Sequence, residues 1–114
     1  MQWKFVLGVP MMAVTVLLLV ACSDTPIEEV TPAAGVSNVI VEDNQFGPRA
    51  ISVPAGTQVT WDFQDNHDHD VVGDGFASER MTTGIFTHTF TAPGTYDYRC
   101  TLHSNMTGRV VVTP

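Results

Sequence analysis

The sequence predicts an all-β protein, and three observations support this prediction. Several short segments alternate apolar and polar side chains at period two, which is the pattern of half-buried strands. Turn residues separate these segments, as in Pro54-Ala55-Gly56 and Ala92-Pro93-Gly94. No window of helical length carries an apolar stripe with a period of 3.6 residues. Short strands at this spacing are typical of an antiparallel sandwich or barrel.

The first element is an export signal over residues 1–21. Lys4 precedes an apolar run that begins at Phe5 and ends in Leu19-Val20-Ala21, directly before Cys22. A positive start, an apolar run and a small residue before the cleavage point are the three parts of a secretory signal peptide. The alternative is an uncleaved membrane anchor, because the run is close to the length that spans a bilayer. Both interpretations predict an exported protein held at a membrane.

The four residues that end in Cys22 resemble the lipobox of bacterial lipoproteins, whose cysteine is acylated and becomes the new N-terminus. We therefore expect a lipid anchor on Cys22, in the periplasm or on the outer face of the cytoplasmic membrane. The alternative for Cys22 is a disulfide with Cys100, the only other cysteine of the chain, and the lipobox argues against it. An unpaired Cys100 in an oxidising compartment must be deeply buried or bound to something.

Residues 22–35 are predicted to be the lipidated N-terminus and a flexible tether. They are rich in Pro, Ala, Thr and Glu and have no apolar periodicity. A flexible chain of this length typically spans about 20 Å, so the domain would stay close to its membrane. Residues 36–114 then form a single domain.

The charge of the mature chain argues against anionic partners. Cleavage before Cys22 leaves four Arg, no Lys and twelve acidic residues, which is a formal charge of −8. Such a surface repels nucleic acid and anionic lipid and favours cationic partners.

The domain contains six segments that read as strands. They are residues 36–42, 50–56, 57–63, 84–90, 94–100 and 108–114. In the third, Val59, Trp61 and Phe63 alternate with polar residues, and we assign them to the core. In the fourth, His88 lies between two phenylalanines on one face, so we expect a hydrogen-bonded structural histidine. In the fifth, Cys100 shares a face with two tyrosines.

A cysteine, a histidine and a methionine lie within seven residues, at Cys100, His103 and Met106. Thiolate and thioether are soft ligands and imidazole is borderline, so this set suits copper better than calcium or magnesium. A structural zinc site would normally need more thiolates. Blue copper sites use two His and one Cys, with a weak axial Met. The loop supplies three of those four ligands, and the second histidine must come from elsewhere.

The segment GTYDYRCTLHSNMTGRVVV, residues 94–112, closely resembles the C-terminal copper loop of cupredoxins, the small blue copper proteins. Its C-x-x-H-x-x-M spacing looks like that of amicyanins, and plastocyanins have a longer gap between His and Met. Upstream, FGPRAISVPAGTQVTWDF is similar to the second and third strands of the family. The resemblance implies a Greek-key β-sandwich over residues 36–114 with one type 1 copper ion that cycles between Cu(I) and Cu(II).

The remaining copper ligand has two candidates, His67 and His69. The family's histidine follows the strand that ends in VTW, and His69 lies eight residues after Trp61, the spacing of amicyanin-like sequences. In an extended chain His67 could point to the same side, because it lies two residues earlier. We expect His69 to bind the metal and His67 to be solvated. The predicted ligands are therefore His69, Cys100, His103 and Met106.

The sequence departs from the family pattern around these ligands. Asp70 stands where Asn usually follows the first histidine, and Asp68 and Leu102 stand where Pro is usual. Asp65, Asp68, Asp70 and Asp74 bracket His69, so we expect several carboxylates near the copper end of the domain. A nearby negative charge stabilises Cu(II) over Cu(I) and should lower the reduction potential.

The resemblance implies an electron-transfer protein rather than an enzyme, because protein ligands fill every position and leave none for a substrate. The lipobox adds the expectation of a lipid anchor. We expect a monomer that passes single electrons between redox partners outside the cytoplasm, with His103 as the electron port. The partners should carry a cationic docking surface, as a basic cytochrome does. The rival function is copper storage or delivery without a redox partner, and a third is a sandwich that acts only as an interaction module.

Overall fold

The computed structural model describes residues 25–114, so the predictions for the export signal and for Cys22 lie outside the described residues. A 3₁₀ helix, η1, spans Ile27–Glu29. The strands are β1 (Ala33–Ala34), β2 (Asn38–Glu42), β3 (Gln45–Gly47), β4 (Ala50–Pro54), β5 (Thr57–His69), β6 (Val72–Gly73), β7 (Phe76–Ala77), β8 (Met81–Phe90), β9 (Gly94–Arg99) and β10 (Thr107–Thr113). No helix within residues 25–114 is long and apolar enough to cross a membrane.

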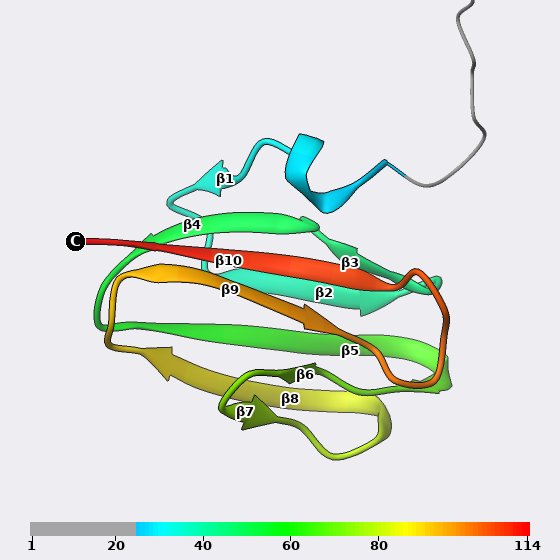
Figure 1. Ribbon diagram of the computed structural model, residues 1–114. Helices are drawn as coiled ribbons and strands as arrows, with labels where there is room; N and C mark the ends of the chain where they lie inside the picture. Colours follow the sequence, from blue (N-terminus) through cyan, green and yellow to red (C-terminus); the bar gives the residue numbers. More distant parts are fainter. Residues whose placement is uncertain (1–24) are drawn as a thin grey trace, which may run out of the picture.

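The strands form two sheets packed as a sandwich (Figure 1). One sheet has the order β1-β4-β10-β9-β6-β7, and the other has the order β3-β2-β5-β8. The predicted all-β sandwich is thereby confirmed. The pairing is mixed rather than purely antiparallel, because β2 lies parallel to β5 and β4 lies parallel to both β1 and β10. Parallel neighbours require the connecting chain to cross over, and here it crosses between the two sheets.

Strand β5 provides the centre of the core. Val59, Trp61 and Phe63 are 0%, 0% and 1% exposed, which confirms their assignment to packing. Four aromatic rings lie within 6.4 Å of the Trp61 ring, centroid to centroid: Phe76, Phe86, Phe90 and Tyr98. His88 joins this cluster, since its ring stacks on Phe76 at 4.9 Å. The core is therefore a contiguous aromatic layer between the two sheets.

The segment expected to be a flexible tether differs from that expectation in its described part. Residues 33–34 form β1, which pairs with Ile51 and Ser52 of β4. The N–H of Gly35 also donates to the carbonyl of Ser52 at 3.1 Å. Residues 33–35 therefore contact the sandwich, and β4 supplies partners for their backbone polar groups.

Candidate metal centre

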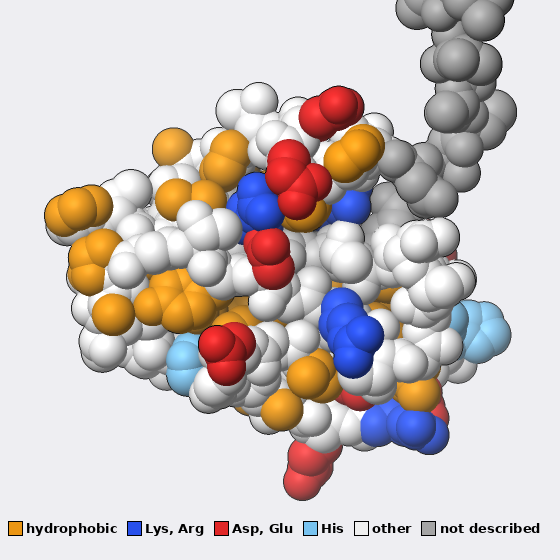
Figure 2. Space-filling model, in the orientation of Figure 1, with side chains coloured by type: hydrophobic (Ala, Val, Ile, Leu, Met, Phe, Trp, Pro, Cys, Tyr) orange, Lys and Arg blue, Asp and Glu red, His pale blue; other side chains and the backbone are white. Residues whose placement is uncertain are grey.

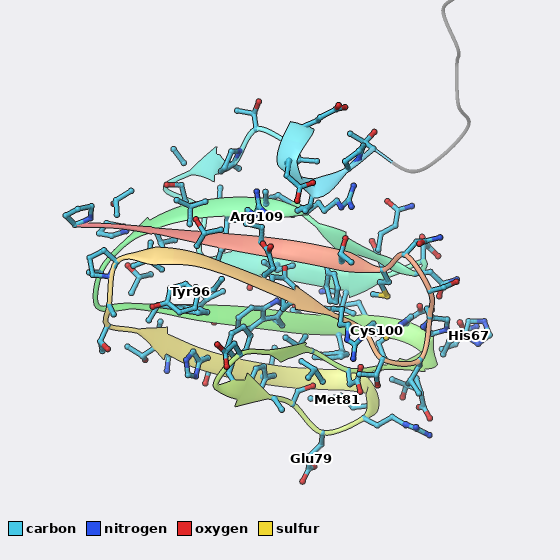
Figure 3. The ribbon with its side chains drawn as sticks, viewed as in Figure 1. His67, Glu79, Met81, Tyr96, Cys100 and Arg109 are labelled. Atoms are coloured by element: carbon cyan, nitrogen blue, oxygen red, sulfur yellow. The ribbon has the colours of Figure 1, made fainter. Side chains whose placement is uncertain are left out.

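The predicted copper loop is the tip of the hairpin formed by β9 and β10. The last paired residues are Arg99 and Thr107, and the N–H of Cys100 donates to the carbonyl of Met106 at 2.9 Å. Because Tyr98 faces the core and strand side chains alternate, Cys100 faces the core as well. Cys100, labelled in Figure 3, lies at the base of this loop. Cys100 and Met106 are 3% and 2% exposed. The hairpin thus buries a free thiol and a thioether at one end of the sandwich.

The structure brings two histidines to this thiol. The Nδ1 atoms of His69 and His103 lie 3.9 Å and 3.5 Å from the Sγ of Cys100. The three ligand atoms all lie within 4.8 Å of one another, although His69 is 31 residues from Cys100 in the chain. His69 is fully buried, whereas His103 is half-buried. The residues expected from the sequence as strong ligands therefore converge on one point.

An irregularity in β5 separates the two candidate histidines. Gln64 pairs with Thr83 of β8, but the next pair joins His69 to Met81, so five steps along β5 match two along β8. The extra residues bulge out of the ladder, as extra residues in one strand of a pair do. His67 lies in this bulge and is exposed, and its side chain projects away from Cys100 (Figure 3). The bulge turns His69 inward and leaves His67 in solvent.

Asp65 holds the buried His69 ring from the side opposite Cys100. Its Oδ2 lies 2.7 Å from the Nε2 of His69 and accepts the N–H of Asp43 at 3.1 Å. Its Oδ1 accepts the N–H of Asn66 at 2.7 Å. The sequence had indicated Asp65 only as one of several carboxylates around His69, and the contact with the ring appears only in the structure.

The charge of Asp65 fixes which nitrogen of His69 carries hydrogen. The hydrogen bond with His69, helped by the N–H of Asn66, lowers the pKa of Asp65 to about 2. An ionised carboxylate only accepts, so Nε2 donates, and in the neutral imidazole Nδ1 then keeps a free lone pair. That lone pair is on the atom near Cys100, so His69 is prepared to bind a metal through Nδ1. Carboxylate–histidine pairs play this orienting role in many metal sites.

Asp70 directly follows the last residue of β5 and ties this end of the strand to the copper loop. The N–H of Thr101 donates to Oδ1 of Asp70 at 2.6 Å, and the Thr101 hydroxyl donates to Oδ2. Partial burial opposes ionisation, but the hydrogen bonds from Thr101 outweigh it and hold the pKa of Asp70 below its ordinary value. An anionic side chain therefore lies directly beside the residue that follows Cys100, as the sequence predicted for this end of the domain.

The donor set fits copper. One thiol and two imidazole nitrogens meet in a buried place, and a buried thioether lies at the base of the same loop. A thiolate with two imidazoles and a weak thioether is the ligand set of a blue copper site. A structural zinc site would use more thiolates, and Cys100 is the free cysteine of the described chain. Calcium and magnesium need oxygen ligands, which this cluster of nitrogen and sulfur atoms does not offer.

We expect Asp65→Ala to weaken copper binding by roughly 10–100-fold, the usual effect of losing a partner that orients a ligand. Asp65→Asn should weaken it less, because the amide oxygen can still accept a hydrogen bond from Nε2. Competition with a chelator of known affinity measures both effects. Asp68→Ala is the matched control, since Asp68 is an exposed carboxylate next to His69 in sequence. Equal affinities for Asp65→Ala and Asp68→Ala would contradict an orienting role for Asp65.

Comparisons with known proteins agree with this geometry. The family model described as a cupredoxin-like domain matches residues 10–112. Amicyanin-alpha of Methylorubrum extorquens is 34% identical over 87 residues, which are 69% of this chain and 73% of that protein. Amicyanin of Paracoccus denitrificans is 32% identical over 98 residues, 79% of this chain and 75% of that protein. A solved structure of an amicyanin variant in its reduced Cu(I) form has a TM-score of 0.64 at 30% identity and covers 80% of this chain and 92% of that one.

Proposed function

This chain belongs to the cupredoxin-like domain family, and from that premise we propose that it is a blue copper protein that transfers single electrons. One observation carries the proposal. The Sγ of Cys100 and the Nδ1 atoms of His69 and His103 lie within 4.8 Å of one another, and Met106, whose carbonyl accepts the Cys100 N–H, is buried at the base of the same loop. His69, Cys100 and His103 would hold the copper ion strongly, and Met106 would be its weak axial ligand.

Copper bound here would supply a one-electron couple between Cu(I) and Cu(II). The protein's part is to hold the ligands still, and the structure offers three devices for this. Asp65 fixes the His69 ring, and Asp70 ties the end of β5 to Thr101. The backbone hydrogen bond from the Cys100 N–H to the Met106 carbonyl closes the loop. Ligands held in this way need little rearrangement when an electron arrives or leaves.

His103 supports transfer to a partner at this end of the domain. Of the three clustered residues it is the one that is not fully buried, and half-buried Leu102 packs against the core beside it. An electron can therefore enter or leave through the His103 ring without opening the buried site. Four protein ligands would leave no position for a substrate, which favours electron transfer over catalysis.

The proposed function also includes a location, at the membrane outside the cytoplasm. Residues 1–21 would direct export, and lipid on Cys22 would hold the chain at the membrane, where it would serve redox partners outside the cytoplasm. The formal charge of −8 after cleavage favours a partner with a cationic docking surface. On the face seen in Figure 2, Arg side chains lie among the acidic ones, so this face carries no uniform acidic patch.

The colour of the copper-loaded protein tests the proposal. A thiolate–copper bond should give an intense visible charge-transfer band that bleaches on reduction and returns on oxidation. A colourless copper complex would refute a type 1 site. A protein that readily gives its copper to a competing chelator and shows no reversible bleaching would instead indicate copper storage or delivery.

We expect Asp70→Asn to raise the reduction potential. The change removes a negative charge but keeps the shape, and the amide can still accept the Thr101 N–H and donate to its hydroxyl. Two unit charges 8 Å apart interact by roughly 2 kcal/mol at an effective dielectric constant of 20 and by about a quarter of that in water. Since about 59 mV corresponds to ~1.4 kcal/mol for one electron, the rise should be roughly 20–90 mV and smaller at high salt.

Redox titration of the visible band measures this shift. Asp62→Asn is the matched control, because Asp62 pairs with Ile85 and His69 pairs with Met81, four residues apart on β8, which is roughly 13 Å along the strand. An unchanged potential in Asp70→Asn would mean that the carboxylate serves only to tie Thr101 in place.

A further inference from the structure

The segment of residues 25–35, called the N-terminal strap below, lies along the edge of the sheet that contains β10. Its strand β1 extends that sheet beyond β4, and η1 lies over β10 (Figure 1). Ile27 of η1 lines an apolar groove with Val72 and Gly108. The strap is therefore held by backbone pairing at one end, and near the other end η1 lies over β10 with Ile27 facing the groove.

Two arginines of the sandwich fasten the first residues of the strap. Arg49 donates through Nη1 to the carbonyl of Thr25, and through Nη2 to the hydroxyl of Thr107 at 2.8 Å. Arg109 lies 3.6 Å from a carboxylate oxygen of Glu28, on the side of β10 that faces η1 (Figure 3). Arg49 thus joins the start of the strap to Thr107, which directly follows the predicted axial ligand Met106.

The strap enters the domain at the end that carries the metal ligands. β1 runs parallel to β4, and the first residue of β4, Ala50, pairs with Arg109 close to the copper loop. Thr25 and Pro26 also line a cavity of about 650 Å³ together with Ser104, Asn105 and Met106 of that loop. The opposite end of β10, at Thr113, lies about 20 Å further along the strand.

The covalent chain then limits how far the copper loop can lie from Cys22. Three peptide steps separate Cys22 from Thr25, and a fully extended chain covers at most about 11 Å over that length. A flexible tether of 14 residues would leave the domain free to turn, but a strap fastened at Thr25 does not. A lipid on Cys22 would therefore hold the copper-loop end, rather than the opposite end, beside the bilayer.

We propose that the N-terminal strap orients the copper-loop end toward the membrane surface, so that the redox partner is a protein held in that membrane with its redox group near the surface. This inference rests on the proposed function, namely copper at the cluster and lipid on Cys22. It adds that the route through His103 opens toward the membrane rather than toward the surrounding solution.

The orientation can be measured with the copper ion as the probe. The lipidated, copper-loaded chain is bound to phosphatidylcholine vesicles that contain lipids with a nitroxide on the headgroup. Paramagnetic Cu(II) beside the bilayer should speed the spin relaxation of these nitroxides several-fold relative to the same sample reduced to diamagnetic Cu(I). Blue, vesicle-bound protein without this enhancement would overturn the orientation and leave the copper function intact. Protein that is colourless or stays in solution would refute the proposed function and this inference together.

A variant with a longer connection between Cys22 and the strap tests whether this short connection causes the relaxation enhancement. Twenty Gly and Ser residues inserted between Asp24 and Thr25 add a typical span of about 25 Å and leave every strap contact in place. The relaxation enhancement should fall several-fold in this variant. The same twenty residues added after Pro114 are the matched control and should leave the enhancement unchanged. If the insertion before Thr25 leaves the enhancement unchanged, the short connection does not hold the copper-loop end beside the bilayer.

An electron donor bound to the membrane tests whether the protein exchanges electrons with a partner held in that membrane. A reduced viologen attached to a lipid headgroup passes one electron to Cu(II), and bleaching of the visible band reports the transfer. The native chain should bleach several-fold faster than the variant with the insertion before Thr25, whereas dissolved methyl viologen radical should reduce both at the same rate. Equal rates with the lipid-bound donor would overturn the membrane-held partner.

Discussion

Cys100→Ser should abolish the intense visible band of the copper-loaded protein. The band requires a copper–thiolate bond, and a serine hydroxyl does not supply the soft, ionised sulfur that forms it. Cys100 is buried, faces two imidazole nitrogens at 3.5 and 3.9 Å, and is the free cysteine of the described chain. No other described side chain can therefore take its place, and the loss should be complete.

The visible spectrum after copper loading measures this outcome, and far-ultraviolet circular dichroism checks that the variant is folded. Met106→Gln is the control on the same loop. It should keep the coloured site but lower the reduction potential, because an oxygen donor favours Cu(II) over Cu(I). A blue Cys100→Ser protein would end the type 1 copper hypothesis.

His69→Ala should destroy the site or alter it severely, while His67→Ala should leave the visible spectrum almost unchanged. His69 is fully buried and places Nδ1 beside Cys100, whereas His67 is exposed in the bulge of β5. Removing a ligand should reduce copper affinity by more than the roughly 10–100-fold that follows the loss of an orienting partner. The truncation also leaves Asp65 without the ring that it binds.

The pair of variants forms its own control, since both remove one imidazole from the same strand. Visible spectra and chelator competition, measured side by side, distinguish the two positions. A lost band in His67→Ala together with a normal band in His69→Ala would show that the bulge in β5 is placed differently in the copper-bound protein.

The sequence alone predicted the fold class and three neighbouring residues of the candidate metal centre. Period-two alternation in residues 57–63 reports which side chains face the core, because successive strand side chains point to opposite faces. Cys100, His103 and Met106 lie within seven residues, so a single hairpin loop brings them together without any long-range contact. Local patterns of this kind can be recognised before any tertiary contact is known.

The tertiary structure decided what depends on distant or irregular contacts. Strand alternation alone does not distinguish His67 from His69, and the choice of His69 came from the family resemblance. The bulge against β8 supplies the physical reason, because it turns His69 inward and His67 outward. The hydrogen bonds of Asp65 with His69 and of Arg49 with Thr25 and Thr107 also appear only in the tertiary structure. No sequence pattern predicts them, because each depends on where a bulge or a sheet edge places a side chain in space. Residues 25–35 have the composition of a tether, but residues 33–35 pair with β4 and Arg49 donates to the carbonyl of Thr25, so the segment contacts the sandwich.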